Sequence, residues 1–557
     1  MKIKNWFKDS QNQIIAAVFI ITMVIACAPL VSRYCINGHD LDYHLLRIES
    51  LKEGIKMGRP FLKVNVFFFG EAGYASSMFY PDFLLYIPAL LRVIGVSINA
   101  SYHIFVAMCI ILAYISTYLC VKNMTGLRTC GMISAVTLTL CQYHLDDIYV
   151  RGAVGEYTAF IFIPVIVYAI YNVVCEDMDK PQLFVLGYSG IILCHTASFV
   201  MCVLFGLIVF LISFKKVFLN KKVFLKLIDC VLFTLALTCF YWLPMFEQFM
   251  YTSFYVSTPW VQPKDEALDF VRIFRDTFPS LGPVCILLLV PRIFIKDKKE
   301  EGRDKYRDIL IWAGMAFTLL ACNILPWDRL GKYASFIQFP WRFFIMASVM
   351  FSMAAGILYL SFTDDNLTLK SRGTSILILV LLINGICGFG TINRGLQGYY
   401  DYSDDYYSYK PYTANVIAGE WLPEAVKDKD SLVEDSGHMT LSDGTGIPFT
   451  RIKNTIVADI KTDAEYVDVP FVYYKGYRAE YTGTDGKKTL LWISGEGKNG
   501  LCRVYLSGQG NGRLKVYYRG TVTTWISVFI SVIGILLMVF VYYRYKRDKG
   551  TGNNKIR

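Results

Sequence analysis

The sequence contains little charge for its length. Asp, Glu, Lys and Arg together make up 18% of its 557 residues, whereas hydrophobic residues make up 54%. The mean hydropathy is +0.40. Water-soluble globular proteins are rarely so apolar. The composition therefore excludes an ordinary soluble enzyme and predicts a membrane protein.

The sequence also lacks a cysteine pattern typical of a zinc site or of a small secreted disulfide scaffold. None of its 15 cysteines has zinc-ligand spacing to another. Most lie within hydrophobic runs, as Cys27, Cys109 and Cys202 do, where a small apolar thiol packs well. The alternative is a bridge between Cys35 and Cys502, the two that are expected outside the membrane.

The net charge of +11 does not indicate a nucleic-acid partner, because its cations are not gathered in one domain. They cluster in short connectors between hydrophobic runs, a pattern known as the positive-inside rule. The basic clusters lie at residues 2–8, 215–226, 296–307 and 544–549. The charge therefore indicates topology, and no nucleic acid is expected to bind.

Hydrophobic runs of about 18–20 residues recur along the chain, and each is long enough to cross a bilayer. The apolar stretch 182–214 is divided at His195, where a polar turn interrupts it. The first run is expected to remain as a signal-anchor, because many others follow it. We predict about twelve transmembrane helices, at residues 14–32, 102–121, 129–145, 157–174, 182–194, 199–214, 227–245, 280–295, 309–325, 343–362, 373–392 and 522–543.

An even number of spans with basic connectors inside places both termini in the cytoplasm. We divide the chain into a membrane domain (1–392) with a large first outer loop (33–101), an extracytoplasmic domain (393–521), and a last helix with a basic tail (522–557). The predicted fold class is an α-helical polytopic membrane protein with a β-rich domain before its last helix.

The block 393–521 differs in character from the rest of the chain. Short alternating segments such as 471–474 and 514–518 are bounded by glycine turns at 485–486 and 508–512, which predicts a small β-sandwich or barrel. A tyrosine-rich run at 399–412 precedes them. It is either an interfacial linker or a surface that stacks on sugar rings.

The first polar constellation is Gly38-His39-Asp40-Leu41-Asp42-Tyr43-His44, directly after the first hydrophobic run. The apolar residues that follow predict an amphipathic helix that ends near Gly54–Gly58. Asp40 or Asp42 is suited to act as a general base, and Asp40 with His44 to bind a divalent cation. The alternative is an ion-paired helix start.

Other charged side chains stand at further outward boundaries. Arg151 is suited to bind a phosphate bidentately, and Asp147 or Glu156 is suited to orient a sugar. The alternative is that Arg151 pairs with Asp147 or Glu156 and closes its loop. Arg342 follows Phe339-Pro340-Trp341 at the start of a span, where the helix dipole disfavours a cation. It therefore serves an external anion or an acidic partner, unless it only snorkels to the interface.

Five more residues complete the set of candidates for substrate binding. They are His44, Glu71, Tyr80, His195 and Gln338. Each has a structural alternative, such as a re-entrant loop for Glu71 and Tyr80 or a polar turn for His195. Since the positive-inside rule puts all these outward segments on one side, the convergence favours one shared site.

These strings resemble the bacterial YfhO-like, pyruvoyl-tetrahydropterin-synthase-related membrane proteins, a group that is similar to the GT-C glycosyltransferases. The more specific pieces are Phe339-Pro340-Trp341-Arg342 and the string from Arg151-Gly152 to Gly155-Glu156. The other matching stretches are 38–40 with Tyr43, His44 and Arg47, then 79–81, 149–150, His195, 242–244, Gln338, 419–423 and 473–477.

The resemblance implies an inverting transfer of a sugar from a polyprenyl-phosphate donor to an extracytoplasmic acceptor, such as a cell-surface polymer or glycolipid. In GT-C enzymes an acidic residue of the first outer loop is catalytic, and here the match falls on Asp40, with Asp42 as an extra acid. Arg342 and Arg151 are expected to stabilise the leaving phosphate, with His195 as a secondary donor. The implied location is the bacterial cell membrane, with the site on its outer face.

Two other functions stay open. One is a flippase or transporter for lipid-linked sugars, although transporters usually carry ionisable residues within their spans. Here the span interiors are nearly free of them, and Asp229 lies near a cytoplasmic end. The other is a non-catalytic protein of envelope assembly that works through its outer domain.

Overall fold

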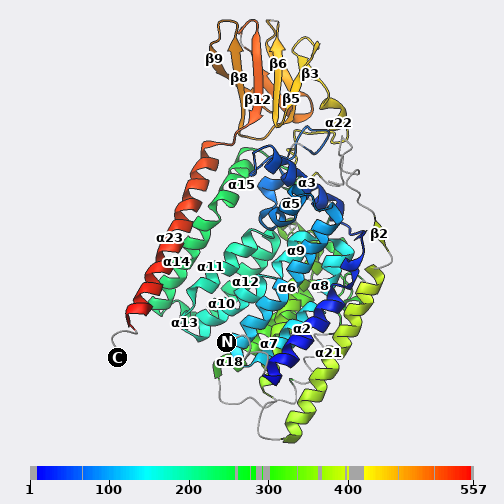
Figure 1. Ribbon diagram of the computed structural model, residues 1–557, viewed down its shortest axis with the longest axis vertical. Helices are drawn as coiled ribbons and strands as arrows, with labels where there is room; N and C mark the ends of the chain where they lie inside the picture. The colour runs from blue at the N-terminus through cyan, green and yellow to red at the C-terminus, as the bar shows by residue number, and fades with distance from the viewer. Residues whose placement is uncertain are drawn as a thin grey trace. The chain divides into compact units, whose positions relative to one another are not determined.

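The computed structural model describes residues 9–552, except for 66, 258–260, 276–277, 284–291, 293–300, 335–336, 362–366, 396–397, 401–418, 462 and 507. The described residues form two compact units, coloured by position along the chain in Figure 1. The first lies within Met1–Glu49, Asp82–Cys230 and Pro259–Tyr406. The second lies within Ser50–Pro81, Val231–Thr258 and Tyr407–Arg557. Most of the predicted span 280–295 and of the tyrosine-rich run 399–412 falls outside the described residues.

The described part of unit 1 is helical, apart from the short antiparallel pair of β1 (Cys35–Ile36) and β2 (Tyr399–Tyr400). Its shorter helical segments include η1 (Ala28–Val31), η3 (Asp147–Arg151), η5 (Phe270–Phe274) and η7 (Pro340–Phe343). Its helices are α2 (Ser10–Ala26), the start of α3 (Leu41–Lys56), α5 (Tyr86–Val93), α6 (Ile98–Thr125), α7 (Arg128–Thr139), α8 (Gln142–Asp146), α9 (Val154–Ala159), α10 (Ile163–Cys175), α11 (Pro181–Ile192), α12 (Thr196–Ile212), α13 (Phe214–Val217), most of α14 (Lys221–Leu237), α16 (Pro263–Glu266), α18 (Glu301–Leu320), α19 (Trp327–Ala334), α20 (Phe344–Leu360) and α21 (Leu367–Gly395).

The ends of α6 illustrate how the local sequence sets these elements. The Ser97 side chain accepts a hydrogen bond from the backbone N–H of Ala100 (3.3 Å) and so caps the first turn. Gly126 then ends the helix in the left-handed region, at φ +76°. In the same way Pro181 stands in the first turn of α11, where its missing N–H costs no hydrogen bond.

The core of unit 1 lies around α20. Every residue from Phe344 to Leu358 is buried, so this helix is apolar on all sides. Gly356 lets α20 approach α7 closely, since a Cβ there would lie 2.2 Å from the Cys130 carbonyl oxygen and the Ser134 hydroxyl. Packing therefore places the segment before α20, which contains Arg342, against the helices around it.

Four described helical segments are long and apolar enough to cross a membrane, namely Ile98–Thr125, Val154–Cys175, Pro340–Leu360 and Val522–Phe540. Shorter apolar helices span Ser10–Ala26, Phe83–Val93, Pro181–Ile192 and Thr196–Ile212. By length and apolarity, the described residues therefore contain fewer membrane-spanning helices than the predicted total of about twelve. The predicted break of the run 182–214 is confirmed, because α11 and α12 are separate helices.

The predicted span at 227–245 contains a bend. Helices α14 and α15 (Cys239–Tyr251) meet at a bend of 74°. Pro244 lies inside α15, but the bend falls earlier, between Leu237 and Cys239. The amphipathic helix predicted after the first span is confirmed as α3, which ends at Lys56.

Unit 2 combines helices with two antiparallel five-stranded sheets (Figure 1). Its helices are the end of α3, α4 (Ser76–Phe79), α15, α22 (Leu432–Asp435) and α23 (Val522–Gly552). The strands, here called the β-domain, are β3 (Met439–Leu441), β4 (Gly446–Ile447), β5 (Thr450–Ile452), β6 (Thr455–Ile460), β7 (Tyr466–Val472), β8 (Tyr477–Gly483), β9 (Lys488–Leu491), β10 (Ile493–Ser494), β11 (Leu501–Tyr505) and β12 (Gly512–Tyr518).

The two sheets have the strand orders β10-β11-β7-β3-β4 and β5-β6-β12-β8-β9. Buried and partly exposed residues alternate along much of each sheet, as at Val467, Asp468 and Val469 of β7. The β-rich region predicted in 393–521 from alternating apolar and polar residues is therefore present in the structure. Cys35 and Cys502 are both free thiols, so they form no bridge.

Candidate functional site

Unit 1 brings five of the predicted residues into one cluster of charges, here called the ion cluster: Asp40, Asp147, Arg151, Glu156 and Arg342. Arg151 is at its centre, with Nη2 lying 3.2 Å from Asp40 Oδ2 and Nη1 3.2 Å from Asp147 Oδ1. Arg151 Nη1 also lies 2.5 Å from Glu156 Oε1. The same Glu156 oxygen is 3.1 Å from Arg342 Nε. Segments distant in sequence thus meet through one buried carboxylate.

Two backbone hydrogen bonds fix Asp40 beside Arg151. The N–H of Asp40 donates to the Arg151 carbonyl (2.7 Å), and the N–H of His39 donates to the Val150 carbonyl (3.2 Å). This approach requires glycine at position 38, because a Cβ there would lie 2.8 Å from the backbone nitrogen of Gly152. Gly38, which the sequence string already contained, is therefore part of the site.

The carboxylates of the ion cluster differ sharply in exposure. The Asp147 side chain is 0% exposed and that of Glu156 2%, whereas that of Asp40 is 42% exposed. Burial, and then the nearby Glu156 carboxylate, raises the pKa of Asp147 well above its ordinary value. Asp40 is therefore the carboxylate of the ion cluster that a ligand can reach.

Arg342 retains hydrogen-bonding capacity that Arg151 has largely used. Its Nε donates to Glu156, and its Nη1 donates to the carbonyl of Ile337 (3.3 Å) and to Gln338 Oε1 (3.2 Å). Its Nη2 has no hydrogen-bond partner among the described residues, and the side chain is 16% exposed. A guanidinium held on one edge and open on another is suited to receive an anion.

Aromatic and phenolic groups that the sequence analysis did not select also support the ion cluster. The ring of Trp341 lies 4.7 Å from the Arg151 guanidinium, and its Nε1–H donates to Glu266 Oε2 (3.3 Å). The Tyr143 hydroxyl donates to Glu156 Oε2 (3.1 Å). Trp341 stands directly before Arg342 in the sequence and Tyr143 four residues before Asp147, so their position beside charged residues was the available signal.

His195 caps the N-terminus of α12. Its Nδ1 lies 2.8 Å from the Ser198 hydroxyl and also accepts from the Ser198 N–H (3.4 Å). Burial lowers the pKa of His195 to about 4, and the nearby arginines add to this effect. At neutral pH the imidazole is therefore uncharged, with its hydrogen on Nε2.

We expect substitution of His195 to change the response of stability to acid. A base whose folded pKa is lowered binds fewer protons when folded, so its contribution to stability falls as pH drops from about 6.5 to about 4. His195→Asn should flatten that part of the melting-temperature profile of the purified protein. Gln338→Asn is the matched comparison, because it adds no titrating group. An unchanged slope in His195→Asn would contradict the buried, neutral imidazole.

His44 is buried and contacts Arg47, with Arg47 Nη1 lying 3.1 Å from His44 Nδ1. A guanidinium only donates, so Nδ1 accepts and the hydrogen of this imidazole is on Nε2. His44 in this state carries a hydrogen-bond donor at Nε2, and its role in binding a cation or a substrate stays a prediction. Within the described part of the chain, no three His, Cys, Asp or Glu side chains gather as a metal site would require.

The remaining predicted residues lie elsewhere. Asp42 stands in the first turn of α3, where its charge suits the helix dipole. Glu71 and Tyr80 belong to unit 2, in which Glu71 Oε2 pairs with Arg451 Nε at 3.5 Å. Their roles in substrate binding stay predictions.

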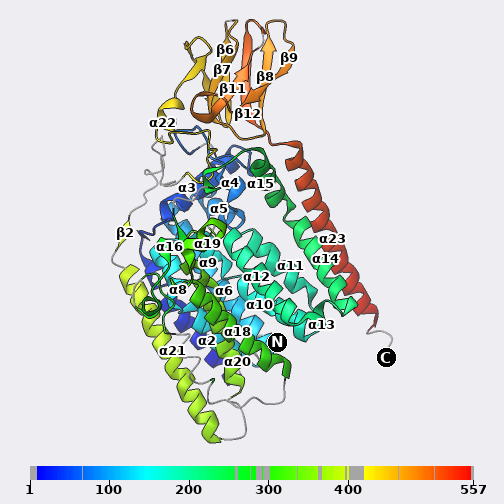
Figure 2. The same ribbon diagram turned by 180° about the vertical axis from the view of Figure 1, so that it is seen from behind.

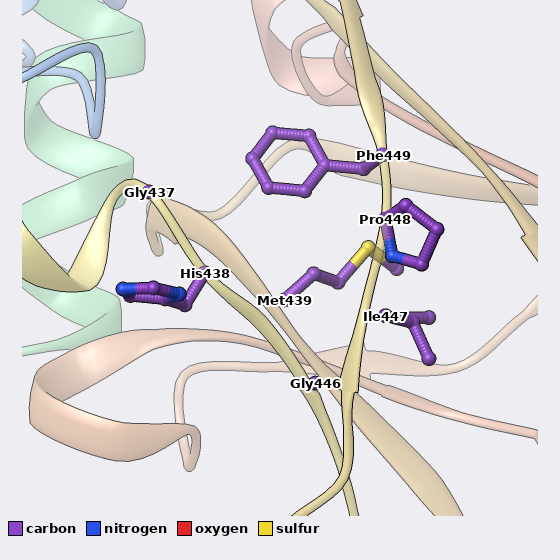
Figure 3. A pocket seen from close by; sticks show the side chains of 7 residues that line it. All are labelled: Gly437, His438, Met439, Gly446, Ile447, Pro448 and Phe449. Carbon is purple, nitrogen blue, oxygen red and sulfur yellow. The ribbon is translucent and has the colours of Figure 1, made fainter.

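The β-domain has a hollow of about 340 Å³ at the edge formed by β3 and β4 (Figure 3). His438 is the one titratable group in its lining. The hollow therefore offers no pair of groups for acid–base chemistry. Its other lining residues are Gly437, Met439, Gly446, Ile447, Pro448 and Phe449.

The helices and the ion cluster are features of a helical membrane protein with a polar site at the ends of its apolar segments. The sequence matches the family of 6-pyruvoyl-tetrahydropterin synthase related membrane proteins over residues 77–389, which is more than half of the chain. The chain belongs to this family. The match includes four members of the ion cluster, while Asp40 precedes it. No curated protein matches the sequence significantly.

Three solved structures of membrane glycosyltransferases share distant similarity with the chain. The arabinofuranosyltransferase AftD from Mycobacteria has a TM-score of 0.39 at 12% identity, with 67% of this chain and 26% of that one covered. The oligosaccharyltransferase AglB from Archaeoglobus fulgidus has a TM-score of 0.38 at 12% identity, with coverages of 71% and 57%. ArnT from Cupriavidus metallidurans, bound to undecaprenyl phosphate, has a TM-score of 0.38 at 9% identity, with coverages of 70% and 76%. Scores this low assign no activity to the chain.

Proposed function

We propose that the protein is a membrane glycosyltransferase of the GT-C type, which transfers a sugar from a polyprenyl-phosphate donor to an extracytoplasmic acceptor. The observation that carries this proposal is the arrangement of the ion cluster. Arg151 positions an accessible carboxylate, Asp40, while the neighbouring Arg342 keeps free donors. Such a transfer needs two groups, a carboxylate that accepts a proton and a cation that binds the leaving phosphate.

In the proposed reaction Asp40 accepts the proton of an acceptor hydroxyl. That oxygen bonds to the anomeric carbon of the sugar on the face opposite the phosphate, so the configuration inverts. The bond between the anomeric carbon and the phosphate oxygen breaks, and the electron pair leaves with the lipid phosphate. Arg342 stabilises this charge through Nη2 and the donors that remain.

The other residues hold this arrangement in place. Arg151 positions Asp40 through its Nη2, and Glu156 holds both guanidinium groups. Gln338 and the Ile337 carbonyl orient Arg342. Neutral His195, near Glu156 and Arg342, supplies an N–H as a secondary donor. The site would lie on the outer face of the bacterial cell membrane, with both chain termini in the cytoplasm.

The direct test is transfer of a labelled sugar by the purified protein in lipid. Wild type and Arg342→Ala are incubated with a series of undecaprenyl-phosphate sugars and a cell-envelope acceptor fraction, and labelled product is counted. We expect transfer from one donor, and a loss of about 10²–10³-fold in Arg342→Ala. Arg329→Ala, a change at a cation outside the ion cluster, should keep full activity.

The same preparation separates the proposal from its alternatives. If no donor is consumed but labelled lipid moves across a vesicle membrane, the protein is a flippase. If neither transfer nor movement is detected with any donor, a non-catalytic role in envelope assembly is favoured.

A further inference from the structure

One face of the sheet β10-β11-β7-β3-β4 carries a row of three aromatic residues (Figure 2 shows β7 and β11). Tyr505 of β11 pairs with Tyr466 of β7. On the other side, the Tyr505 N–H donates to the Trp492 carbonyl (3.1 Å), which continues the register of Ile493 with Val504. Directly paired residues project from the same face, so Trp492, Tyr505 and Tyr466 stand side by side across three strands.

This face points away from the core of the β-domain. The residues that alternate with the aromatic row, Val467 and Val504, are fully buried. Trp492, in contrast, is 72% exposed, and its indole N–H has no hydrogen-bond partner among the described residues. A large aromatic ring left in water with an open donor is typical of a recognition surface.

A row of polar groups runs beside the aromatic row. Ser494, Arg503, Asp468 and Thr440 face each other on four successive strands. Arg503 and Asp468 form a bidentate pair, with Nε–Oδ1 at 2.7 Å and Nη2–Oδ2 at 2.9 Å. The Arg503 guanidinium also stacks on Tyr466, at 3.8 Å from the ring centre, which fixes its plane.

We propose that this aromatic face, defined by Trp492, Tyr505, Tyr466, Arg503 and Asp468, binds a neutral glycan chain. A pyranose ring presents apolar C–H groups on its faces and hydroxyls around its edge. The exposed Trp492 ring suits the apolar C–H faces. The fixed Arg503–Asp468 pair and the indole N–H suit the hydroxyls. Parallel apolar and polar rows match a chain of such rings.

The charges on this face favour a neutral ligand over an anionic one. Arg503 is neutralised by Asp468, and Lys498 lies 2.7 Å from Asp435. Glu496, which accepts from the Tyr505 hydroxyl, adds a negative charge. An anionic polymer would therefore meet no unpaired cation among the described residues named here, and the Glu496 charge would repel it.

The test is calorimetric titration of the full-length protein in detergent with four neutral hexasaccharides: cellohexaose, maltohexaose, mannohexaose and chitohexaose. Poly(glycerol phosphate) serves as the anionic probe. We expect one or more hexasaccharides to bind, and Trp492→Ala to weaken that binding about tenfold or more. Trp492→Phe should retain part of the affinity, because it keeps an aromatic ring.

Leu490→Ala is the matched control, since Leu490 is also exposed on the β-domain (61%) but belongs to the other sheet. It should bind like wild type. The proposal is overturned if none of the four hexasaccharides binds, if Trp492→Ala binds as tightly as wild type, or if the anionic probe binds better than all of them. The titration contains no lipid donor, so an absence of glycan binding would not contradict the proposed transfer reaction. Likewise, an absence of sugar transfer would not contradict glycan binding by the aromatic face.

Discussion

Asp40→Asn should reduce sugar transfer by about 10²–10⁴-fold, with little change in stability. The substitution keeps the size of the side chain and an oxygen that can accept from Arg151, but it removes the group that takes a proton. Since Asp40 is 42% exposed, the amide is readily hydrated and adds little strain. The measurement is the rate of labelled product formation at saturating donor.

Two further variants make this result specific. Glu53→Gln alters a partly exposed acid on α3, the helix that follows Asp40, and should keep full activity, since Glu53 contacts only neighbouring lysines in the interactions described. Asp42→Asn tests the other acid of the same string. If Asp42→Asn abolishes transfer while Asp40→Asn keeps it, the base is Asp42, and the geometry around Arg151 has another purpose.

Glu156→Ala should be the most destabilising single change in the ion cluster. Glu156 is 2% exposed and lies between Arg151 and Arg342, so its loss leaves two guanidinium groups near one exposed carboxylate. Breaking a buried ion pair by removal of one partner costs about 3–5 kcal/mol. We also expect transfer to fall to background, because both arginines lose their common anchor.

Thermal unfolding can be followed by the reaction of cysteines with a fluorescent maleimide, since eleven of the described thiols are buried in the folded protein. Glu156→Ala should unfold at a clearly lower temperature than wild type, and Glu156→Gln at an intermediate one, because the amide still accepts from one arginine. Glu176→Gln changes a carboxylate at the far end of α10 that is 25% exposed, and should shift unfolding little. Equal melting of Glu156→Ala and wild type would mean that the ion cluster contributes nothing to the fold.

The sequence indicated which charged residues need partners, but it did not indicate every bend of the helices. Asp147, Arg151, Glu156 and Arg342 were chosen because charged groups at the ends of apolar runs need partners, and the structure supplies those partners from one another. Hydropathy cannot distinguish a straight span from a bent pair of helices. The bend between α14 and α15 therefore leaves no mark on the hydropathy pattern, because the two helices together are apolar enough for one span.

The local sequence by itself determined where several elements begin and end and which groups cannot stay alone in a membrane. Caps such as Ser97 and Gly126, the amphipathic period of α3 and the strand alternation near Val467 depend on neighbours in the chain. Only the tertiary structure decided which carboxylate each arginine meets. Arg151 had Asp147 and Glu156 nearby in sequence, but its contact with Asp40 and the link to Arg342 require segments 111 and 186 residues apart to pack together. Such contacts follow from the close packing of helices and the absence of a side chain at Gly38, and no local pattern encodes them.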